Sequence, residues 1–322
     1  MFKLLPDTRV YCIVLCCLCC MHAGAQLTYN ELSVQYDSPW TYKKLQLIPI
    51  RFKGVGGGLE ENGGITGNVI SFSEALNKNK ITVKEMSSDG GPDVSTLMIK
   101  NHSKDNVMLI SGELLKGGKQ DRAVGKTTII PPGRRKKNYV SVFCVERGRW
   151  DDKSKSFKHA GTAGTGVRKQ IDVSQRQNKI WKQIDYELAA GNKKNRTSAY
   201  LYAYNDSTID DTSYLHFFIN KMKSSDSSYA GFIAISGDQI INAQIFADSS
   251  LCLAAYVQNI KSYVHSLVPG NGTPSETKEE LKAFADKFLP DTTTQKKYLS
   301  LHGRMYYYEG QVIHLIAYDD SP

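Results

Sequence analysis

The chain has 322 residues, of which 41% are hydrophobic and 23% are charged, and its formal net charge is +9 at pH 7. This composition excludes a disordered or collagen-like protein, and it predicts one or two globular domains with a sizeable core.

Residues 1–25 have the pattern of a secretory signal peptide. Basic residues precede an apolar run from Val10 to Met21, and a small-residue segment ends at Ala25. The run is shorter than the roughly 20 residues that span a bilayer. We therefore expect cleavage after Ala25, a mature chain without a transmembrane segment, and a periplasmic or extracellular protein secreted across the inner membrane. An uncleaved anchor is the alternative.

Removal of this leader changes the meaning of the cysteine count. Five of the seven cysteines lie within it, so the mature chain would keep only Cys144 and Cys252. That excludes a disulfide framework and leaves open one bridge between these two residues. The seven histidines are scattered and form no HExxH or HxxxH pair, so we expect no metal site and no cofactor.

The first half of the chain predicts mostly β-strands. Short apolar runs alternate with Gly, Pro, Asn and Asp, which is typical of a sandwich or a compact mixed sheet. Expected strands cover residues 45–50, 81–83, 96–99, 107–110, 128–130 and 139–143. Ser71, with Glu74 three residues later, predicts the start of one short helix. The glycine-rich residues 54–67 predict a loop.

Residues 151–167 are rich in Lys, Ser, Gly and Thr and predict a loop that divides the chain. Beyond it, expected helices cover residues 174–190, 214–222, 249–267 and 275–288, and expected strands cover 230–235, 239–246, 297–308 and 312–318. The predicted fold is α+β, with a β-rich N-terminal half, sandwich-like or a mixed sheet, and a helix-decorated C-terminal half. We expect a leader at 1–25, a β-rich region at 26–150 and an α+β region at 151–322, the last two forming one composite domain.

The densest group of charged and glycine residues lies between Ser111 and Trp150. From Lys116 to Arg149 there are ten basic residues and two acidic ones. Glycines allow a ligand close to the backbone, arginine and lysine can hold an anion, and two carboxylates can divide acid and base work. The predicted site comprises catalytic Glu113 and Glu146, and ligand-binding Gly118, Lys119, Gln120, Arg122, Arg149 and Trp150.

This segment resembles the ARG and rhodanese-phosphatase-superfamily-associated protein domain, a family named for its genomic association with ADP-ribosylglycohydrolases. The motifs that carry the resemblance are Gly112-Glu113, Gly118-Lys119-Gln120-x-Arg122, Pro131-Pro132, Cys144-Val145-Glu146-x-Gly148-Arg149-Trp150, Phe157, Arg168, Gly231 to Ala234 and Ala243 to Phe246. The resemblance covers most of residues 40–268, and it implies a link to ADP-ribose or phosphorylated ligands without giving a reaction. The leader departs from that implication, because NAD-linked metabolism is sparse outside the cytoplasm. A secreted phosphorylated or acidic-sugar ligand would use the same cations.

The same residues also have structural interpretations. Glu113 and Arg149 could pair with each other, or with Lys119 and Arg122, in a buried network. Cys144 follows an alternating apolar strand, which favours a buried structural thiol over a nucleophile. Trp150 could be a core residue rather than a stacking platform.

The preferred function is binding of an anionic small molecule or a modified protein, with an ADP-ribose-like or sugar-phosphate ligand as examples and hydrolysis as an open step. The alternative is a non-catalytic envelope or extracellular protein that contacts glycan or another protein. The basic run from Arg134 to Lys137 predicts a solvated loop. Nucleic-acid binding through that run is the least favoured reading, because the leader directs the chain out of the cytoplasm. The reaction and the oligomeric state stay open.

Overall fold

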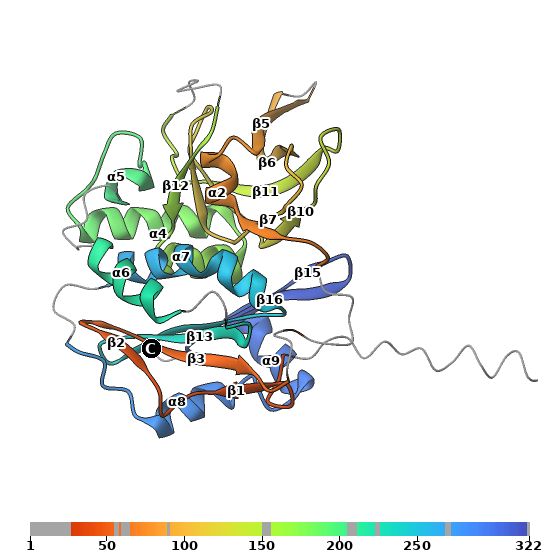
Figure 1. Ribbon diagram of the computed structural model, residues 1–322. Helices are drawn as coiled ribbons and strands as arrows, with labels where there is room; N and C mark the ends of the chain where they lie inside the picture. Colours follow the sequence, from red (N-terminus) through yellow and green to blue (C-terminus); the bar gives the residue numbers. More distant parts are fainter. Residues whose placement is uncertain are drawn as a thin grey trace, which may run out of the picture.

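The computed structural model describes residues 27–54, 58, 65–88, 91–149, 156–204, 211–222, 226–267 and 272–320. The predicted leader, most of the glycine-rich segment and Trp150 lie outside these residues. Within them the chain forms an α+β fold in layers, as the sequence predicts (Figure 1).

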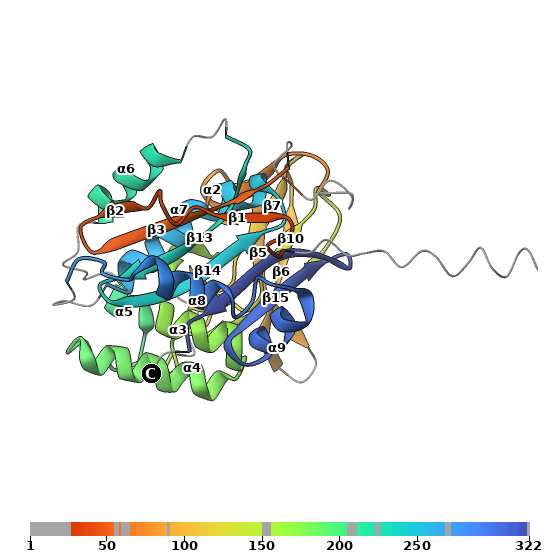
Figure 2. The ribbon, with the colours of Figure 1, turned by 90° about the horizontal axis from the view of Figure 1, so that it is seen from below.

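A seven-stranded antiparallel sheet, here called sheet A, forms one layer. Its strand order is β1-β3-β13-β14-β16-β15, and β2 also pairs with β3. The strands are β1 (Leu32–Val34), β2 (Trp40–Tyr42), β3 (Leu45–Phe52), β13 (Tyr229–Ser236), β14 (Gln239–Phe246), β15 (Gly303–Tyr308) and β16 (Gln311–Tyr318). In register, Ile233 of β13 is paired with Ile48 of β3 on one side and with Ala243 of β14 on the other. Strands from before and after residue 150 therefore share one sheet, and Figure 2 shows them side by side.

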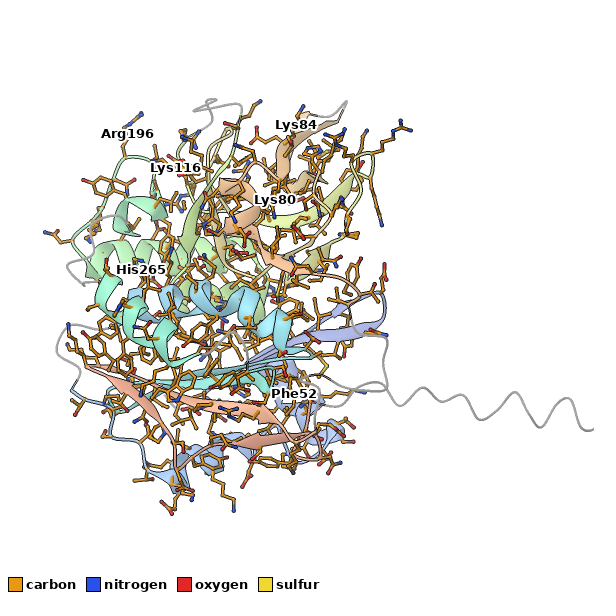
Figure 3. All side chains as sticks on the ribbon, viewed as in Figure 1. Phe52, Lys80, Lys84, Lys116, Arg196 and His265 are labelled. Atoms are coloured by element: carbon orange, nitrogen blue, oxygen red, sulfur yellow. The ribbon has the colours of Figure 1, made fainter. Side chains whose placement is uncertain are left out.

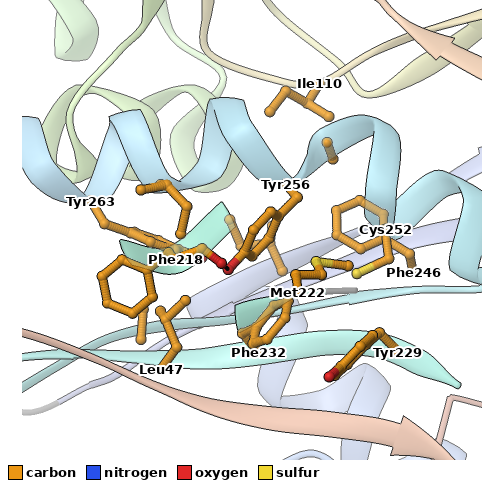
Figure 4. Close-up of a cluster of buried hydrophobic side chains, with 14 of the residues drawn as sticks. Leu47, Ile110, Phe218, Met222, Tyr229, Phe232, Phe246, Cys252, Tyr256 and Tyr263 are labelled. Atoms are coloured by element: carbon orange, nitrogen blue, oxygen red, sulfur yellow. Dashed lines mark hydrogen bonds between the residues drawn. The ribbon is translucent and has the colours of Figure 1, made fainter. Parts of the chain in front are cut away.

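Helices cover both faces of sheet A. On one face lie α7 (Ser249–His265) and α6 (Asp211–Lys221), and on the other lie α8 (Lys278–Ala285) and α9 (Thr292–His302). Strand β13 alternates accordingly, since Phe232 belongs to the core beneath α7 and Ile233 to the core against α8. Figure 4 shows Tyr256 and Tyr263 of α7 directed toward Phe232 and the strand that carries Leu47.

A second β-rich layer lies on the far side of α7 (Figure 1). It contains a six-stranded sheet in the order β12-β8-β9-β11-β6-β5 and a three-stranded sheet in the order β10-β7-β4. The strands are β4 (Val69–Ser71), β5 (Ile81–Ser88), β6 (Gly91–Asn101), β7 (Asn106–Leu109), β8 (Glu113–Lys116), β9 (Arg122–Val124), β10 (Thr128–Ile130), β11 (Asn138–Cys144) and β12 (Lys158–Thr162). Aliphatic side chains from both sheets form the core of this layer together with Phe72 of α2 (Phe72–Asn77). The Ser71 hydroxyl accepts a hydrogen bond from the Glu74 N–H at 3.1 Å, which confirms the predicted helix start.

A group of helices packs against β8 and β9. It runs through α3 (Thr165–Lys169), a π-helix (Gln170–Ser174), α4 (Gln177–Ala190) and α5 (Tyr200–Tyr204). Ile180, Ile184 and Leu188 of α4 are buried against this layer, as their four-residue spacing predicts.

Two predicted segments are wrong, and a predicted helix begins at a different residue. Residues 151–167 are not one loop, because residues 158–162 form β12, which pairs with β8, and residues 165–169 are helical. Residues 297–302 are helical rather than extended, because Asp291 accepts hydrogen bonds from Thr293 N and Thr294 N and starts α9. Helix α8 begins with a capping box between Thr277 and Glu280, not at Ser275.

Arg168 and Asp172, both fully buried, form a polar junction between these layers. The Arg168 guanidinium donates to the side-chain oxygens of Asn259 and Gln244, each at 2.9 Å. Asp172 accepts hydrogen bonds from the hydroxyls of Tyr306 at 2.5 Å and Tyr318 at 2.6 Å. The α3 and π-helix segment is thereby tied to α7 and to sheet A.

Candidate functional site

The glycine motif forms the turn between β8 and β9. Gly117 and Gly118 have φ values of +137° and +55°, which L-residues rarely adopt. A Cβ atom on Gly117 would lie 2.4 Å from the Ser156 carbonyl oxygen. Glycine is therefore required at this position, and the turn passes close to the chain before β12.

The loop before α5 pairs with residues 145–148, the segment that carries Glu146. The Gly148 N–H donates to the Thr197 carbonyl at 2.8 Å, and the Tyr200 N–H donates to the Val145 carbonyl at 2.9 Å. A Cβ atom on Gly148 would lie 2.8 Å from the Thr197 Cα. Only a glycine permits this approach of the two backbones.

Arg149 ties the segment that carries Glu146 to the turn between β8 and β9. Its Nε donates to Glu146 Oε2 at 2.7 Å, its Nη2 donates to Asp121 Oδ1 at 3.1 Å, and its Nη1 donates to the Gly118 carbonyl at 2.6 Å. The side chains of Asp121 and Glu146 are only 2% and 3% exposed, and that of Arg149 is 10% exposed. The guanidinium thus neutralises two buried carboxylates in fixed positions.

A cleft of about 340 Å³ opens over these two carboxylates. Its lining consists of Lys116, Asp121, Glu146, Asn195, Arg196, Thr197, Ala199, Leu201 and Tyr202. The Thr197 hydroxyl donates to Glu146 Oε1 at 3.1 Å. Lys116 and Arg196 are exposed and lie at the same end of the molecule (Figure 3). The cleft therefore combines buried carboxylates with exposed cations, and Tyr202, 60% exposed, adds an aromatic ring.

Of the eight predicted site residues, Glu146 lines this cleft, and Arg149 contacts its two carboxylates. Glu113 lies elsewhere: its Oε1 accepts from His159 Nε2 at 3.0 Å and its Oε2 accepts from the Ile110 N–H at 2.9 Å. The pairing of Glu113 with Arg149, Lys119 or Arg122 that we considered is thus replaced by pairing with His159. Trp150 lies outside the described residues.

The other predicted ligand-binding residues hold the turn itself. Arg122 is 1% exposed, and it donates to the Gln120 carbonyl at 2.9 Å and to Glu85 Oε1 at 3.3 Å. The same Glu85 oxygen accepts from the Lys119 N–H at 3.0 Å. Gln120 donates from Nε2 to the Arg147 carbonyl at 3.2 Å. Gly118 packs over Glu85, since a Cβ atom there would lie 2.7 Å from Glu85 Oε1.

Sequence reasoning missed the downstream wall of the cleft. Asn195, Arg196, Thr197 and Tyr202 belong to no motif, and only backbone pairing with residues 145–148 brings them to Glu146. Lys116 and Asp121 lie within the segment from Ser111 to Trp150, and the excess of basic residues in that segment was the available signal.

Neither Cys144 nor Cys252 lines the cleft. Cys144 and Cys252 are both buried free thiols, so no bridge joins them. Burial raises the pKa of each thiol, which disfavours a nucleophilic role. The part of the chain that the structure describes holds no group of three or more His, Cys, Asp or Glu side chains placed to bind a metal ion. No helix among those residues is both long enough and apolar enough to cross a membrane.

Fold and cleft together define an α+β protein with a charged cleft of small-molecule size between two glycine-dependent turns. The chain belongs to the ARG and Rhodanese-Phosphatase-superfamily-associated Protein domain family, whose model matches residues 33–318. The match extends beyond the residues 40–268 that carried the resemblance and takes in every strand of sheet A except the first residue of β1. No curated protein and no solved structure matches the chain.

Proposed function

We propose that the cleft binds an anionic small molecule, with a sugar phosphate as the preferred class and an ADP-ribose-like ligand as the larger variant. The observation that carries this proposal is the placement of Lys116 and Arg196 beside the buried carboxylates of Asp121 and Glu146. A phosphate group would be held by the two cations through charge-assisted hydrogen bonds. Sugar hydroxyls would donate to the carboxylates, and the ring would lie against Tyr202.

The size of the cleft supports a compact ligand. Its volume of about 340 Å³ is at the low end of the roughly 300–1,000 Å³ of small-molecule sites. A monosaccharide phosphate matches that volume better than an extended dinucleotide.

Hydrolysis of the bound ligand is the catalytic form of the proposal. A carboxylate beside the ligand is the candidate general base, and Glu146 holds that role here. Glu113 was the second predicted carboxylate, but Asp121 rather than Glu113 lines the cleft, so the proposal gives the second role to Asp121. Export through the leader at residues 1–25 is part of the same proposal, and it rests on the sequence pattern alone.

Thermal unfolding in the presence of candidate ligands tests binding. Sugar phosphates, a nucleotide and ADP-ribose are compared with the matching uncharged sugars. A ligand at 100 times its Kd would stabilise the protein by about 2.7 kcal/mol, and a Lys116→Ala/Arg196→Ala variant should lose this shift. The variant Lys296→Ala/Lys297→Ala, which removes the same charge from exposed positions on α9 outside the cleft lining, is the control. Absence of any shift, or a shift retained in the cleft variant, would overturn the proposal.

A non-catalytic binding protein is the second candidate, and one observation favours it. Arg149 already satisfies both carboxylates, as a structural network would require. Turnover of a bound sugar phosphate decides between the two: hydrolysis by the wild type that is lost in Glu146→Gln, with binding retained, supports an enzyme. Binding without turnover by the wild type supports the non-catalytic role.

A further inference from the structure

The outer surface of β5, β6 and β11 carries a concentration of cations that the cleft does not use. We call it the basic face, and it consists of Lys84, Lys100, Arg134, Arg135, Lys136, Lys137, Met98 and Tyr139. The four consecutive basic residues form the exposed turn before β11. Lys84 marks this surface in Figure 3, at the end of the molecule away from sheet A.

Strand register places these side chains on one surface. Tyr139 of β11 is paired with Met98 of β6, which is paired with Lys84 of β5. Residues two apart on a strand point to the same side, so Lys100 shares the side of Met98. The intervening residues Leu97 and Ile99 are buried in the core beneath.

The cations of the basic face lack acidic partners. None of the six forms an ion pair with a carboxylate among the residues that the structure describes, whereas nearby Lys80 pairs with Asp105 at 2.8 Å. Exposed basic side chains with no counter-charge create a local positive potential that attracts anions. Tyr139 stands in the same row and is 58% exposed, so its ring is accessible from solvent.

The arrangement is an array rather than a pocket. Neighbouring strands lie about 4.8 Å apart and alternate residues of one strand about 7 Å apart, so the cations extend over several sugar or phosphate units. An array of this kind matches a linear polyanion better than a single small anion, and an exposed tyrosine within it offers a surface on which a ring can stack.

We propose that the basic face docks an acidic polysaccharide, a chain of sugar rings that bear carboxylate or sulfate groups. The choice of polysaccharide over nucleic acid rests on the proposed export, because acidic glycans are the polyanions that an exported protein meets at cell surfaces. The cleft plays no part in this docking, since it shares no residue with the basic face.

Binding of the full chain to immobilised heparin and to polygalacturonate, measured as a function of salt, tests the proposal. A single-stranded DNA of similar length and a neutral dextran serve as comparison polymers. We expect binding to the acidic polysaccharides that weakens steeply with salt and falls roughly tenfold or more in the Lys84→Ala/Lys100→Ala/Lys137→Ala variant. Tyr139→Ala should weaken it further, and Tyr139→Phe should leave it unchanged, because stacking needs the ring and not the hydroxyl.

The matched control is Lys282→Ala/Lys296→Ala/Lys297→Ala, which removes the same charge from exposed positions on α8 and α9 across sheet A. Equal weakening in both triple variants would show an effect of net charge and overturn the assignment of the basic face. Tighter binding of the DNA than of either polysaccharide would overturn the choice of partner. Retained sugar-phosphate shifts in the basic-face variant would show that the cleft is intact, so the two proposals fail separately.

Discussion

Replacement of Arg149 by methionine gives the sharpest test of how the cleft is built. Methionine keeps a long apolar side chain but removes the cation that contacts both Asp121 and Glu146. These two carboxylates are 2% and 3% exposed, so water would only partly replace the lost charge-assisted hydrogen bonds. The variant would leave these two buried carboxylates without the guanidinium that contacts both of them.

The expected loss follows from that geometry. Removal of one partner from a buried ion pair costs about 3–5 kcal/mol, and here one cation serves two anions and one carbonyl. This is a large part of a total stability of about 5–15 kcal/mol. It corresponds to a fall in the thermal unfolding midpoint on the order of 10 °C.

Urea unfolding at pH 7, followed by circular dichroism, measures this loss. The control is Arg147→Met, because Arg147 is two residues away, its side chain is 50% exposed, and it pairs with Asp185 at 3.3 Å. An exposed pair of that kind contributes less than about 1 kcal/mol. The double variant Arg149→Met/Glu146→Gln lacks the negative charge of Glu146. Its loss of unfolding free energy should therefore be smaller than the sum of the losses in Arg149→Met and Glu146→Gln, by roughly 1–3 kcal/mol. A loss for Arg149→Met as small as that for Arg147→Met, or strict additivity in the double variant, would refute this reasoning.

Three further predictions concern backbone fit and pH. Gly148→Ala should lower the free energy of unfolding by about 1–3 kcal/mol through overpacking, because the new Cβ would lie 2.8 Å from the Thr197 Cα. It should also weaken the ligand-induced thermal shifts. Urea unfolding measures the loss, and Gly272→Ala, whose Cβ would have nothing within 4 Å, is the control. Burial lowers the pKa of His314 well below 6.5, so the unfolded chain takes up a proton that the folded one refuses. Stability should therefore fall as pH drops below about 6.5, and His314→Gln should flatten that slope; an unchanged slope would contradict the assignment. Burial and the neighbouring Glu280 raise the pKa of Glu276 to about 7, so its contribution to stability is lost as pH rises from its ordinary value of 4.5 to about 7. Glu276→Gln should accordingly raise the thermal midpoint at pH 8 and leave it unchanged at pH 4.

Much of the fold could be predicted because its elements have regular periods. The alternation in β13 and the four-residue spacing of Ile180, Ile184 and Leu188 depend only on local geometry and on which side meets the core. Helix α9 escaped prediction because it runs directly into the tyrosine-rich strand β15, so the predicted strand was extended back over residues 297–302. Strand β12 escaped because its stability comes from pairing with β8, not from apolar residues of its own.

The candidate site was predictable only in part, and the reason is the separation of its parts along the chain. The charged segment itself shows in the sequence, but the partners of its residues do not. Glu113 meets His159, Arg122 meets Glu85, and Glu146 meets Thr197 across 46, 37 and 51 positions respectively. No local pattern encodes such pairings, because tertiary packing alone brings the side chains together.

The strand order of sheet A has a consequence for how the chain folds. Two internal strands of this sheet come from distant parts of the sequence. Strand β3 is formed by residues 45–52, and strand β16, between β14 and β15, is formed by residues 311–318. Until residue 318 is available, β14 presents an unpaired edge, and Asp172 lacks the Tyr306 and Tyr318 hydroxyls that satisfy it. Pairings between such distant segments slow folding, and an open edge strand invites pairing with another chain. A chain that is held unfolded until its full length is present would avoid that hazard.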